Sequence, residues 1–253
     1  MSRNPFSLEG KNILITGASS GIGRQCAISC SQMSAKVILV ARNEERLKET
    51  LSMMEGNGHD YYSLDLNDID SIKELVTTIT TSIGKLDGFI HAAGIEKTLP
   101  IKLLSTEDYN NIFKVNALSA FEFIRMFSNK KYFNDNGHIV LISSITSVIG
   151  RGGVTAYAAS KGAMISAVKT MALELAPKGI CINCISPGTV LTPMMNKYLS
   201  TLTEEEYINR VSGFPLGLGN CEDVANACVF LLSEASRWIT GTNLIVDGGY
   251  TTR

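Results

Sequence analysis

Short apolar runs alternate with segments of helical periodicity along the whole chain, and this alternation constrains the fold more than any other feature. Lys36–Ala41 (KVILVA) is almost continuously apolar and rich in β-branched residues, as expected of a strand buried on both faces. Asp68–Ile83 instead places apolar residues every three or four positions, which predicts an amphipathic helix. Because strands that alternate with helices pair through right-handed crossovers, we expect a parallel sheet covered by helices on both faces.

The same patterns divide residues 1–253 into seven strands and six main helices of a single domain. The predicted strands are Asn12–Thr16, Lys36–Ala41, Tyr61–Leu64, Leu86–His91, His138–Ser143, Ile180–Ile185 and Asn243–Val246. The predicted helices are Gly21–Met33, Glu44–Glu55, Asp68–Ile83, Ser105–Phe127, Thr155–Ala176 and Cys221–Leu232. Residues 188–220 break the alternation and hold one short predicted helix, Thr203–Val211, so we expect a lid there. The fold class that follows is α/β, with a doubly wound, seven-stranded parallel sheet.

Composition and charge exclude several classes of protein. The chain has 45% hydrophobic residues and a formal net charge of −1, which excludes a wholly disordered protein. Its 23 Lys and Arg residues balance 24 Asp and Glu residues without a basic stripe, which argues against a nucleic-acid partner. No apolar segment is long enough to span a bilayer, and the polar segment Met1–Gly10 lacks the apolar core of a secretory signal, so we expect no membrane partner.

Cysteines and histidines indicate neither disulfides nor a metal site. The six cysteines are scattered, so we expect reduced thiols and a cytoplasmic protein. Cys181 and Cys184 lie three residues apart on a predicted strand and therefore point to opposite faces, which disfavours a redox pair. The three histidines, His59, His91 and His138, lie in separate segments, so we expect no bound metal.

Three glycines follow the first predicted strand and open the first predicted helix. They lie in Gly17-Ala18-Ser19-Ser20-Gly21-Ile22-Gly23, with the spacing Gly-x-x-x-Gly-x-Gly. Glycines permit a tight turn and the close approach of a pyrophosphate, and the N–H groups at a helix N-terminus attract its negative charge. Because a strand and a helix flank the turn, we interpret it as the phosphate site of a dinucleotide rather than as an ordinary turn.

The end of the second predicted strand bears on which dinucleotide binds. The strand ends at Ala41 and is followed by Arg42, so the acidic residue that would bind a free ribose 2′-hydroxyl is absent there. An arginine can instead form a bidentate, charge-assisted contact with a 2′-phosphate. The pattern favours NADP(H) over NAD(H), and the alternative is that Arg42 is a solvated residue at the start of a loop.

Tyr157 and Lys161 lie four residues apart on a predicted helix and therefore share a face. A phenol with a pKa of about 10 is a weak acid–base group at neutral pH, and a nearby ammonium lowers that pKa. Tyr157 could then donate a proton to a ketone oxygen, or remove it from an alcohol in the reverse direction. Taken alone, the spacing is more typical of a packed ring beside a solvated amine.

Together these motifs resemble those of the short-chain dehydrogenase/reductase family. Residues 16–23 (TGASSGIG) match its cofactor motif, Tyr157-Ala158-Ala159-Ser160-Lys161 matches its Tyr-x-x-x-Lys motif, and Pro187-Gly188 and Val246-Asp247-Gly248-Gly249 follow in the family's order. The resemblance covers essentially the whole chain and is nearest to the 3-oxoacyl-(acyl-carrier-protein) reductases. It implies a Rossmann-type domain and an enzyme that interconverts a ketone and a secondary alcohol by hydride transfer, with NADP(H) as cofactor and Tyr157 as the acid or base.

The resemblance also assigns roles to individual residues. The catalytic set that it implies is Asn116, Ser144, Tyr157 and Lys161, in which Ser144 bonds the substrate carbonyl and Asn116 links Lys161 to solvent through a water. The cofactor-binding residues that it implies are Gly17, Ser19, Ser20, Gly21, Ile22, Gly23, Arg42, Asp65, Leu66, His91, Ala92, Gly94, Tyr157, Lys161, Pro187, Val190 and Thr192. Asp65 would contact the adenine amino group or cap the following helix, and we interpret His91 as a structural hydrogen-bonding residue near the adenosine.

The substrate stays open at this point. A carrier-bound 3-oxoacyl group is one interpretation, and a steroid, polyol or sugar-derived ketone or alcohol is another. Leu173 and Leu218 stand where carrier-dependent relatives usually have basic residues, which weakens the first interpretation. A catalytically idle NADP(H)-binding sensor on the same fold is a third possibility, against which the complete catalytic set argues.

Residues expected to face the substrate come from the lid and from two loops. The lid offers an apolar set of Leu191, Met194, Met195, Tyr198, Leu199 and Phe214. Val148, Ile149 and Arg151 lie between Ser144 and Tyr157, and Glu96 follows the fourth predicted strand as a possible polar contact.

The two longest predicted helices bear on assembly. Ser105–Phe127 and Thr155–Ala176 carry apolar residues on more than one face, and exposed apolar patches usually mark an interface. In the family that the chain resembles, these helices pair across a two-fold axis and the last strand forms a second contact. We therefore expect a homotetramer, with a dimer as the alternative.

Overall fold

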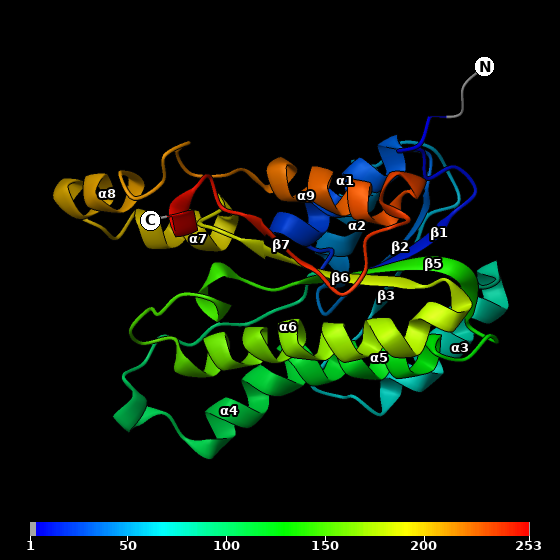
Figure 1. Ribbon diagram of the computed structural model, residues 1–253, viewed down its shortest axis with the longest axis horizontal. Coiled ribbons are helices and arrows are strands. Elements are labelled where there is room, and N and C mark those ends of the chain that lie inside the picture. Colours follow the sequence, from blue (N-terminus) through cyan, green and yellow to red (C-terminus); the bar gives the residue numbers. More distant parts are fainter. Residues whose placement is uncertain (1–3, 253) are drawn as a thin grey trace.

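The computed structural model describes residues 4–252, apart from the side chain of Met194, and contains a seven-stranded sheet between two layers of helices (Figure 1). The strands are β1 (Asn12–Thr16), β2 (Lys36–Ala41), β3 (Asp60–Ser63), β4 (Leu86–His91), β5 (Phe133–Ile142), β6 (Cys181–Pro187) and β7 (Asn243–Val246). They pair in parallel in the order β3-β2-β1-β4-β5-β6-β7, which confirms the predicted fold class. The strand order reverses between β1 and β4, and in such sheets ligands bind beyond the carboxyl ends of the strands at that point.

Each face of the sheet has its own layer of helices and its own core (Figure 1). One layer comprises α1 (Gly21–Gln32), α2 (Glu44–Ser52) and α9 (Cys221–Leu232), and the other comprises α3 (Ser71–Ile83), α4 (Thr106–Phe113), α5 (Ser119–Phe127) and α6 (Thr155–Leu175). Successive residues of β2 feed the two cores in turn, because side chains alternate between the faces of a strand. Ile38 packs with the α3–α6 layer, whereas Val37 and Leu39 pack with the α1–α9 layer.

Strand β5 begins at Phe133, five residues before the predicted start at His138. Phe133 pairs with Leu86 and His138 pairs with Gly88, so the register of β5 against β4 shifts between these pairs. Asn136 takes a positive φ of 60° within this irregular stretch. The polar residues of this stretch lack the apolar pattern of a buried strand, so the sequence pattern does not predict that the strand begins at Phe133.

The predicted helix Ser105–Phe127 is not a uniform α-helix. It begins as predicted, with Ser105 and Asp108 forming a reciprocal capping box at the start of α4. Residues Lys114–Leu118 then form a π-helical turn before α5 begins. Such turns are rare and frequently lie at functional sites. This one contains Asn116, whose side chain is fully buried.

The lid contains two helices, α7 (Pro193–Leu199) and α8 (Glu204–Val211), of which only α8 was predicted. Thr203 and Glu206 form the capping box of α8. The start of α7 carries its own sequence signal, because the Thr192 hydroxyl accepts a hydrogen bond from Met195 N and Pro193 occupies the first turn. Proline at the first helical position behind a threonine cap is a recognised start signal.

Two further expectations concern membranes and metals. Within residues 4–252, no helix combines the length and the apolar character needed to cross a bilayer. The same part of the chain contains no cluster of three or more His, Cys, Asp or Glu side chains suited to a metal ion. All six cysteines are free, including Cys181 and Cys184 on β6.

His91 ends β4 and lies fully buried beneath the carboxyl edge of the sheet. Its Nε2 lies 3.2 Å from the carbonyl oxygen of Val115, and its Nδ1 lies 2.9 Å from the hydroxyl of Thr16. Because a carbonyl only accepts, Nε2 carries the proton and Nδ1 accepts from Thr16. Burial, together with the charge of Lys161, lowers the pKa of His91 to about 3. His91 is thus a neutral structural residue that joins β1, β4 and the π-helical turn.

We expect the pH dependence of stability to report on His91. The unfolded chain binds one more proton than the folded chain between the ordinary pKa of 6.5 and about 3, so the free energy of unfolding falls as the pH falls through this window. One such proton contributes a slope of up to about 1.4 kcal/mol per pH unit. In urea denaturation between pH 7 and 5, His91→Asn should show a flatter dependence than the wild type. Parallel curves for the two proteins would contradict this assignment.

Candidate active site

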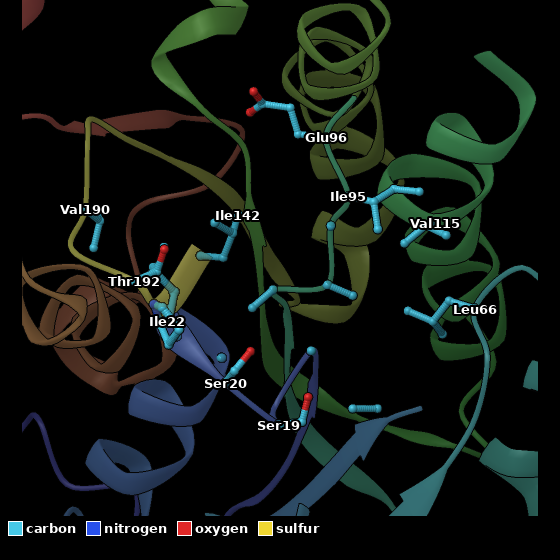
Figure 2. A pocket seen from close by; sticks show the side chains of 18 of the residues that line it. Ser19, Ser20, Ile22, Leu66, Ile95, Glu96, Val115, Ile142, Val190 and Thr192 are labelled. Atoms are coloured by element: carbon cyan, nitrogen blue, oxygen red, sulfur yellow. The ribbon is translucent and has the colours of Figure 1, made fainter. Parts of the chain in front are cut away.

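A cavity of about 460 Å³ lies at the carboxyl edge of the sheet, where the strand order reverses (Figure 2). Sixteen of the seventeen predicted cofactor residues line it, from the glycine turn through Arg42 and Asp65 to Thr192. The exception is His91, which lies outside its wall. Ser144, Tyr157 and Lys161 of the predicted catalytic set also line the cavity, whereas Asn116 lies behind it. The fold therefore gathers residues from most of the chain's length around one space.

The glycine turn between β1 and α1 leaves no room for side chains. Gly17 has a φ of +69°, and a Cβ there would lie 2.6 Å from Ala93 N. A Cβ on Gly23 would overlap the carbonyl oxygen of Gly17. Ser20 occupies the N-cap of α1 without using its side chain as a cap, so the first N–H groups of this 12-residue helix remain for an anion at the cavity. This backbone cradle fits the pyrophosphate of a dinucleotide.

Two arginines line the cavity beyond β2. Arg42 was predicted there. Arg46, in the first turn of α2, was missed because the sequence predicts the helix but not which of its faces is turned toward the cavity. Both side chains are exposed to solvent. Asn43 caps α2 by accepting a hydrogen bond from Arg46 N at 2.9 Å, which fixes the start of the helix beside the cavity.

Asp65 lies just beyond β3 and also lines the cavity. Its Oδ1 accepts hydrogen bonds from the Asn67 backbone N–H at 3.0 Å and the Asn67 side-chain amide at 3.2 Å. It therefore closes the turn after β3, whereas Asp70 occupies the N-cap of α3. Of the two roles considered for Asp65, capping the helix is wrong.

Lys161 is buried on α6 with its ammonium beside the Tyr157 ring. Its Nζ donates to the carbonyl oxygen of Ile142 at 2.7 Å and lies 5.7 Å from the centroid of that ring. Burial lowers the pKa of Lys161 to about 8. The ammonium is therefore held by the end of β5 and remains easier to deprotonate than an exposed lysine.

The pKa of Tyr157 is raised to about 12, chiefly by burial and then by the negative charge of Glu96. The Ser144 hydroxyl and the Arg151 guanidinium act in the opposite direction on this pKa, but they do not outweigh burial. The expectation that the ammonium of Lys161 leaves Tyr157 with a lowered pKa is thus wrong, because burial and Glu96 determine the direction of the shift. At neutral pH the phenol is protonated, which suits it to donate a proton.

The Ser144 hydroxyl lines the cavity next to the Tyr157 phenol, whose pKa it lowers. Its Oγ accepts from Thr146 N at 3.2 Å and from Thr146 Oγ1 at 3.0 Å, which leaves its own O–H as a donor. The neighbouring Ser143 is buried and donates instead to the carbonyl oxygen of Lys161 at 3.0 Å. Ser143 therefore fastens α6 to the end of β5, and Ser144 is the one available to a substrate.

Asn116 joins three segments behind the cavity. Its Oδ1 accepts from Ile95 N at 2.8 Å, and its Nδ2 donates to Ile95 O and to Ser160 Oγ, each at 3.0 Å. The side chain thus connects the π-helical turn to the loop after β4 and to α6. Both hydrogens of the Asn116 amide are donated to other groups of the protein. The water that would link Asn116 to Lys161 therefore stays a prediction, and such a water would have to donate to Oδ1.

The substrate side of the cavity is less apolar than the lid sequence suggested. Among the described side chains of that apolar set, only Met195 lines the cavity, while Leu199 is buried and Phe214 is buried against the Tyr250 ring outside the lid. Leu191 and Tyr198 are exposed, and the Met194 side chain lies outside the described part. Glu96 lines this part of the cavity, and Figure 2 shows it at the end remote from Ser19 and Ser20.

Comparison with known proteins decides the family. A family model described as enoyl-(acyl carrier protein) reductase matches residues 17–251, which include the glycine turn, the Tyr157–Lys161 pair and the lid. The chain is a member of the short-chain dehydrogenase/reductase family. It is therefore an oxidoreductase of a family that uses a nicotinamide dinucleotide.

Known relatives differ in substrate. The chain is 36% identical over 245 residues to a 3-oxoacyl-(acyl-carrier-protein) reductase of Thermotoga maritima, covering 96% of this chain and 98% of the relative. It is 34% identical to a glucose 1-dehydrogenase of Gluconobacter oxydans, covering 96% and 92%. A solved Agrobacterium tumefaciens protein, provisionally described as a 2-deoxy-D-gluconate 3-dehydrogenase with bound NADP, superposes with a TM-score of 0.88 at 31% identity, covering 99% and 100%.

Proposed function

We propose that this short-chain dehydrogenase/reductase reduces a ketone to a secondary alcohol with NADPH, and that Tyr157 donates the proton. The observation that carries the proposal is the convergence of three features on one cavity. These are the glycine cradle at one end, the protonated Tyr157 beside buried Lys161, and the hydroxyl of Ser144 next to the Tyr157 phenol.

Different residues of the cavity would bind the cofactor, orient the substrate and transfer the proton. Residues 17–23 would hold the pyrophosphate of the dinucleotide, and when bound this cofactor supplies the hydride. Ser144 donates a hydrogen bond to the substrate carbonyl oxygen, which places that oxygen beside the Tyr157 phenol. Tyr157 then delivers its proton to the developing alkoxide. Lys161, held by Ile142, stabilises the negative charge left on the phenol oxygen.

The cofactor preference follows from the cavity wall beyond β2. Arg42 and Arg46 both line it, and neither has an acidic partner in the described salt bridges. Two guanidinium groups favour a 2′-phosphate over a 2′-hydroxyl. The Agrobacterium tumefaciens relative with bound NADP supports the same preference.

A carrier-bound 3-oxoacyl substrate is supported by the Thermotoga maritima relative. Two side chains weigh against a carrier-docking surface of the usual basic kind. Leu173 on α6 is 78% exposed, and Leu218 is half-buried in the lid. We therefore keep the carrier as a candidate partner and a small free ketone as the other. An idle NADP(H)-binding sensor would use the same cavity but would not need Ser144, Tyr157 and Lys161 together in its wall.

We also propose a cytoplasmic homotetramer. Apolar side chains are exposed on two separate parts of the surface. Leu118 and Leu173 lie on the α5–α6 side, whereas Ile245 is exposed on the edge strand β7 and Trp238, which is 90% exposed, precedes that strand in sequence. Two self-complementary patches on different axes close a tetramer of dihedral symmetry.

Removing the Tyr157 hydroxyl tests the mechanism. Tyr157→Phe keeps the ring that packs beside Lys161 but cannot donate a proton. We expect kcat for ketone reduction to fall by about 10² to 10⁴-fold, while the Kd for NADPH, from fluorescence titration, changes by less than about threefold. Retained turnover in this variant would refute the assignment, and absence of NADPH oxidation by the wild type across a ketone panel would favour the sensor.

The cofactor preference has a direct test at Arg42. Arg42→Ala removes one charge-assisted contact with a 2′-phosphate, so NADPH binding should weaken by about ten- to a hundredfold while NADH binding changes little. Lys48→Ala is the matched control, because Lys48 pairs with Glu44 and Glu45 on α2 and lies outside the cavity wall. Equal losses for both cofactors would show that Arg42 does not contact a 2′-phosphate.

Assembly can be measured by light scattering at micromolar concentration. We expect a mass about four times the 27.4 kDa of the chain. Ala167→Glu places a charge at a half-buried position of α6, beside the core residues Met164 and Val168, and should lower the mass while leaving far-ultraviolet circular dichroism unchanged. A mass near that of one chain for the wild type would overturn the proposal.

A further inference from the structure

A pair of opposite charges lies on the substrate side of the cavity, in two loops that the mechanism above does not use. Glu96 lies in the loop that follows β4, and Arg151 lies in the loop that precedes α6. Glu96 Oε1 is 3.6 Å from the Arg151 guanidinium and accepts a hydrogen bond from Thr98 Oγ1 at 3.1 Å. Of the two charged residues, Glu96 is the one that lines the cavity, as Ser144 and Tyr157 do. Figure 2 shows the Glu96 side chain in this wall.

The fold holds this pair in place from both sides. The residue before Glu96 is Ile95, and Asn116 bonds both its N–H and its carbonyl oxygen. The two loops are fastened together, because Leu99 N donates to Gly153 O at 2.8 Å. Gly153 has a φ of +83°, and a Cβ there would lie 3.2 Å from the Thr98 methyl group. The carboxylate is therefore a fixed part of the wall rather than a side chain on a loose loop.

The Glu96 carboxylate has hydrogen-bond acceptor positions that no described residue uses. Its side chain is 25% exposed, and the ion pair with Arg151 is longer than a hydrogen bond. A carboxylate offers about four acceptor positions, and among residues 4–252 the one hydroxyl that donates to Glu96 is that of Thr98. Its charge also reaches the reacting group, because Glu96 raises the pKa of Tyr157 more than Arg151 lowers it.

Such a wall discriminates between substrates. An alkyl chain laid against the carboxylate would desolvate it without replacing the lost hydrogen bonds, which is costly. A cation is not specially favoured either, because Arg151 already balances the charge. A neutral hydrogen-bond donor satisfies the free acceptor positions. We propose that Glu96 binds a hydroxyl group of the substrate, so that the ketone reduced in this site is a hydroxyketone of the polyol or sugar class.

This inference rests on the proposed ketone reduction, and matched ketones test it separately. In two pairs a hydroxyl replaces a methyl group of the same size: 1-hydroxybutan-2-one against pentan-3-one, and 4-hydroxybutan-2-one against pentan-2-one. The readouts are kcat/KM with NADPH, and the Kd of each ketone by calorimetry on protein saturated with NADP⁺. The wild type should favour the hydroxyketone at least about tenfold in one pair, because its acceptor is unpaired with the alkyl analogue.

Variants assign that preference to Glu96. Glu96→Leu should bring the ratio between the two ketones close to one. Glu107→Gln is the matched control, because it removes an exposed carboxylate from the first turn of α4 outside the cavity wall, and it should keep the wild-type ratio.

Two outcomes overturn the inference. One is an equal kcat/KM and Kd for both members of each pair in the wild type, including no measurable binding of any of them. The other is a wild-type ratio retained by Glu96→Leu. Failure of the proposed function looks different, because no ketone would then be reduced. The Kd ratios would still decide the role of Glu96.

Discussion

The hydrogen bonds between the Asn116 side chain and the Ile95 backbone hold the active site together. They tie the loop after β4 to the π-helical turn, and the third bond of Asn116, to Ser160, adds the helix that carries Tyr157 and Lys161. Asn116 has no access to the cavity, so its contribution is positional. The π-helical turn widens the helix at this point. It allows the buried Asn116 amide to bond both the loop after β4 and helix α6.

Burial sets the chemistry at the carboxyl edge of the sheet. It lowers the pKa values of His91 and Lys161 and raises that of Tyr157, because each group is taken out of water and its charged form loses solvation. Hydrogen bonds to backbone carbonyls compensate in part: His91 bonds Val115 O at 3.2 Å, and Lys161 bonds Ile142 O at 2.7 Å. The site thus combines the neutral phenol of Tyr157 with the Lys161 ammonium, whose pKa is lowered. This arrangement suits Tyr157 to donate a proton.

The sequence predicted the parts of the fold that follow from local pattern. Strand β2 and helix α9 begin and end where their apolar patterns do, and the glycine turn lies where strand, glycines and helix meet. The π-helical turn was not predictable, because a bulge leaves the apolar periodicity on both sides intact. Nor could pattern show that Arg46 faces the cavity, since that depends on how α2 packs. Helix α7 was missed although Thr192 and Pro193 marked its start.

The substrate wall shows the same limit more sharply. Glu96 and Arg151 were both candidate contacts, but 55 positions of sequence separate them and only the packed loops make them an ion pair beside Tyr157. An apolar pocket was the expectation from the lid, and the structure instead buries Leu199 and Phe214 away from the cavity wall and leaves a carboxylate in that wall. Family membership gives the reaction class, and we propose that these few side chains decide which ketone fits.

The position of isotope in the product tests the central claim most directly. A ketone is reduced in ordinary water with NADPH labelled with deuterium at C4 of the nicotinamide, in two preparations that carry the label on opposite faces of the ring, and the alcohol is examined by mass spectrometry. The account predicts that one of the two preparations places one deuterium on the former carbonyl carbon, while the hydroxyl proton comes from solvent. Oxidation of NADPH that leaves the alcohol unlabelled in both cases, or consumption of NADPH without any alcohol, would contradict it.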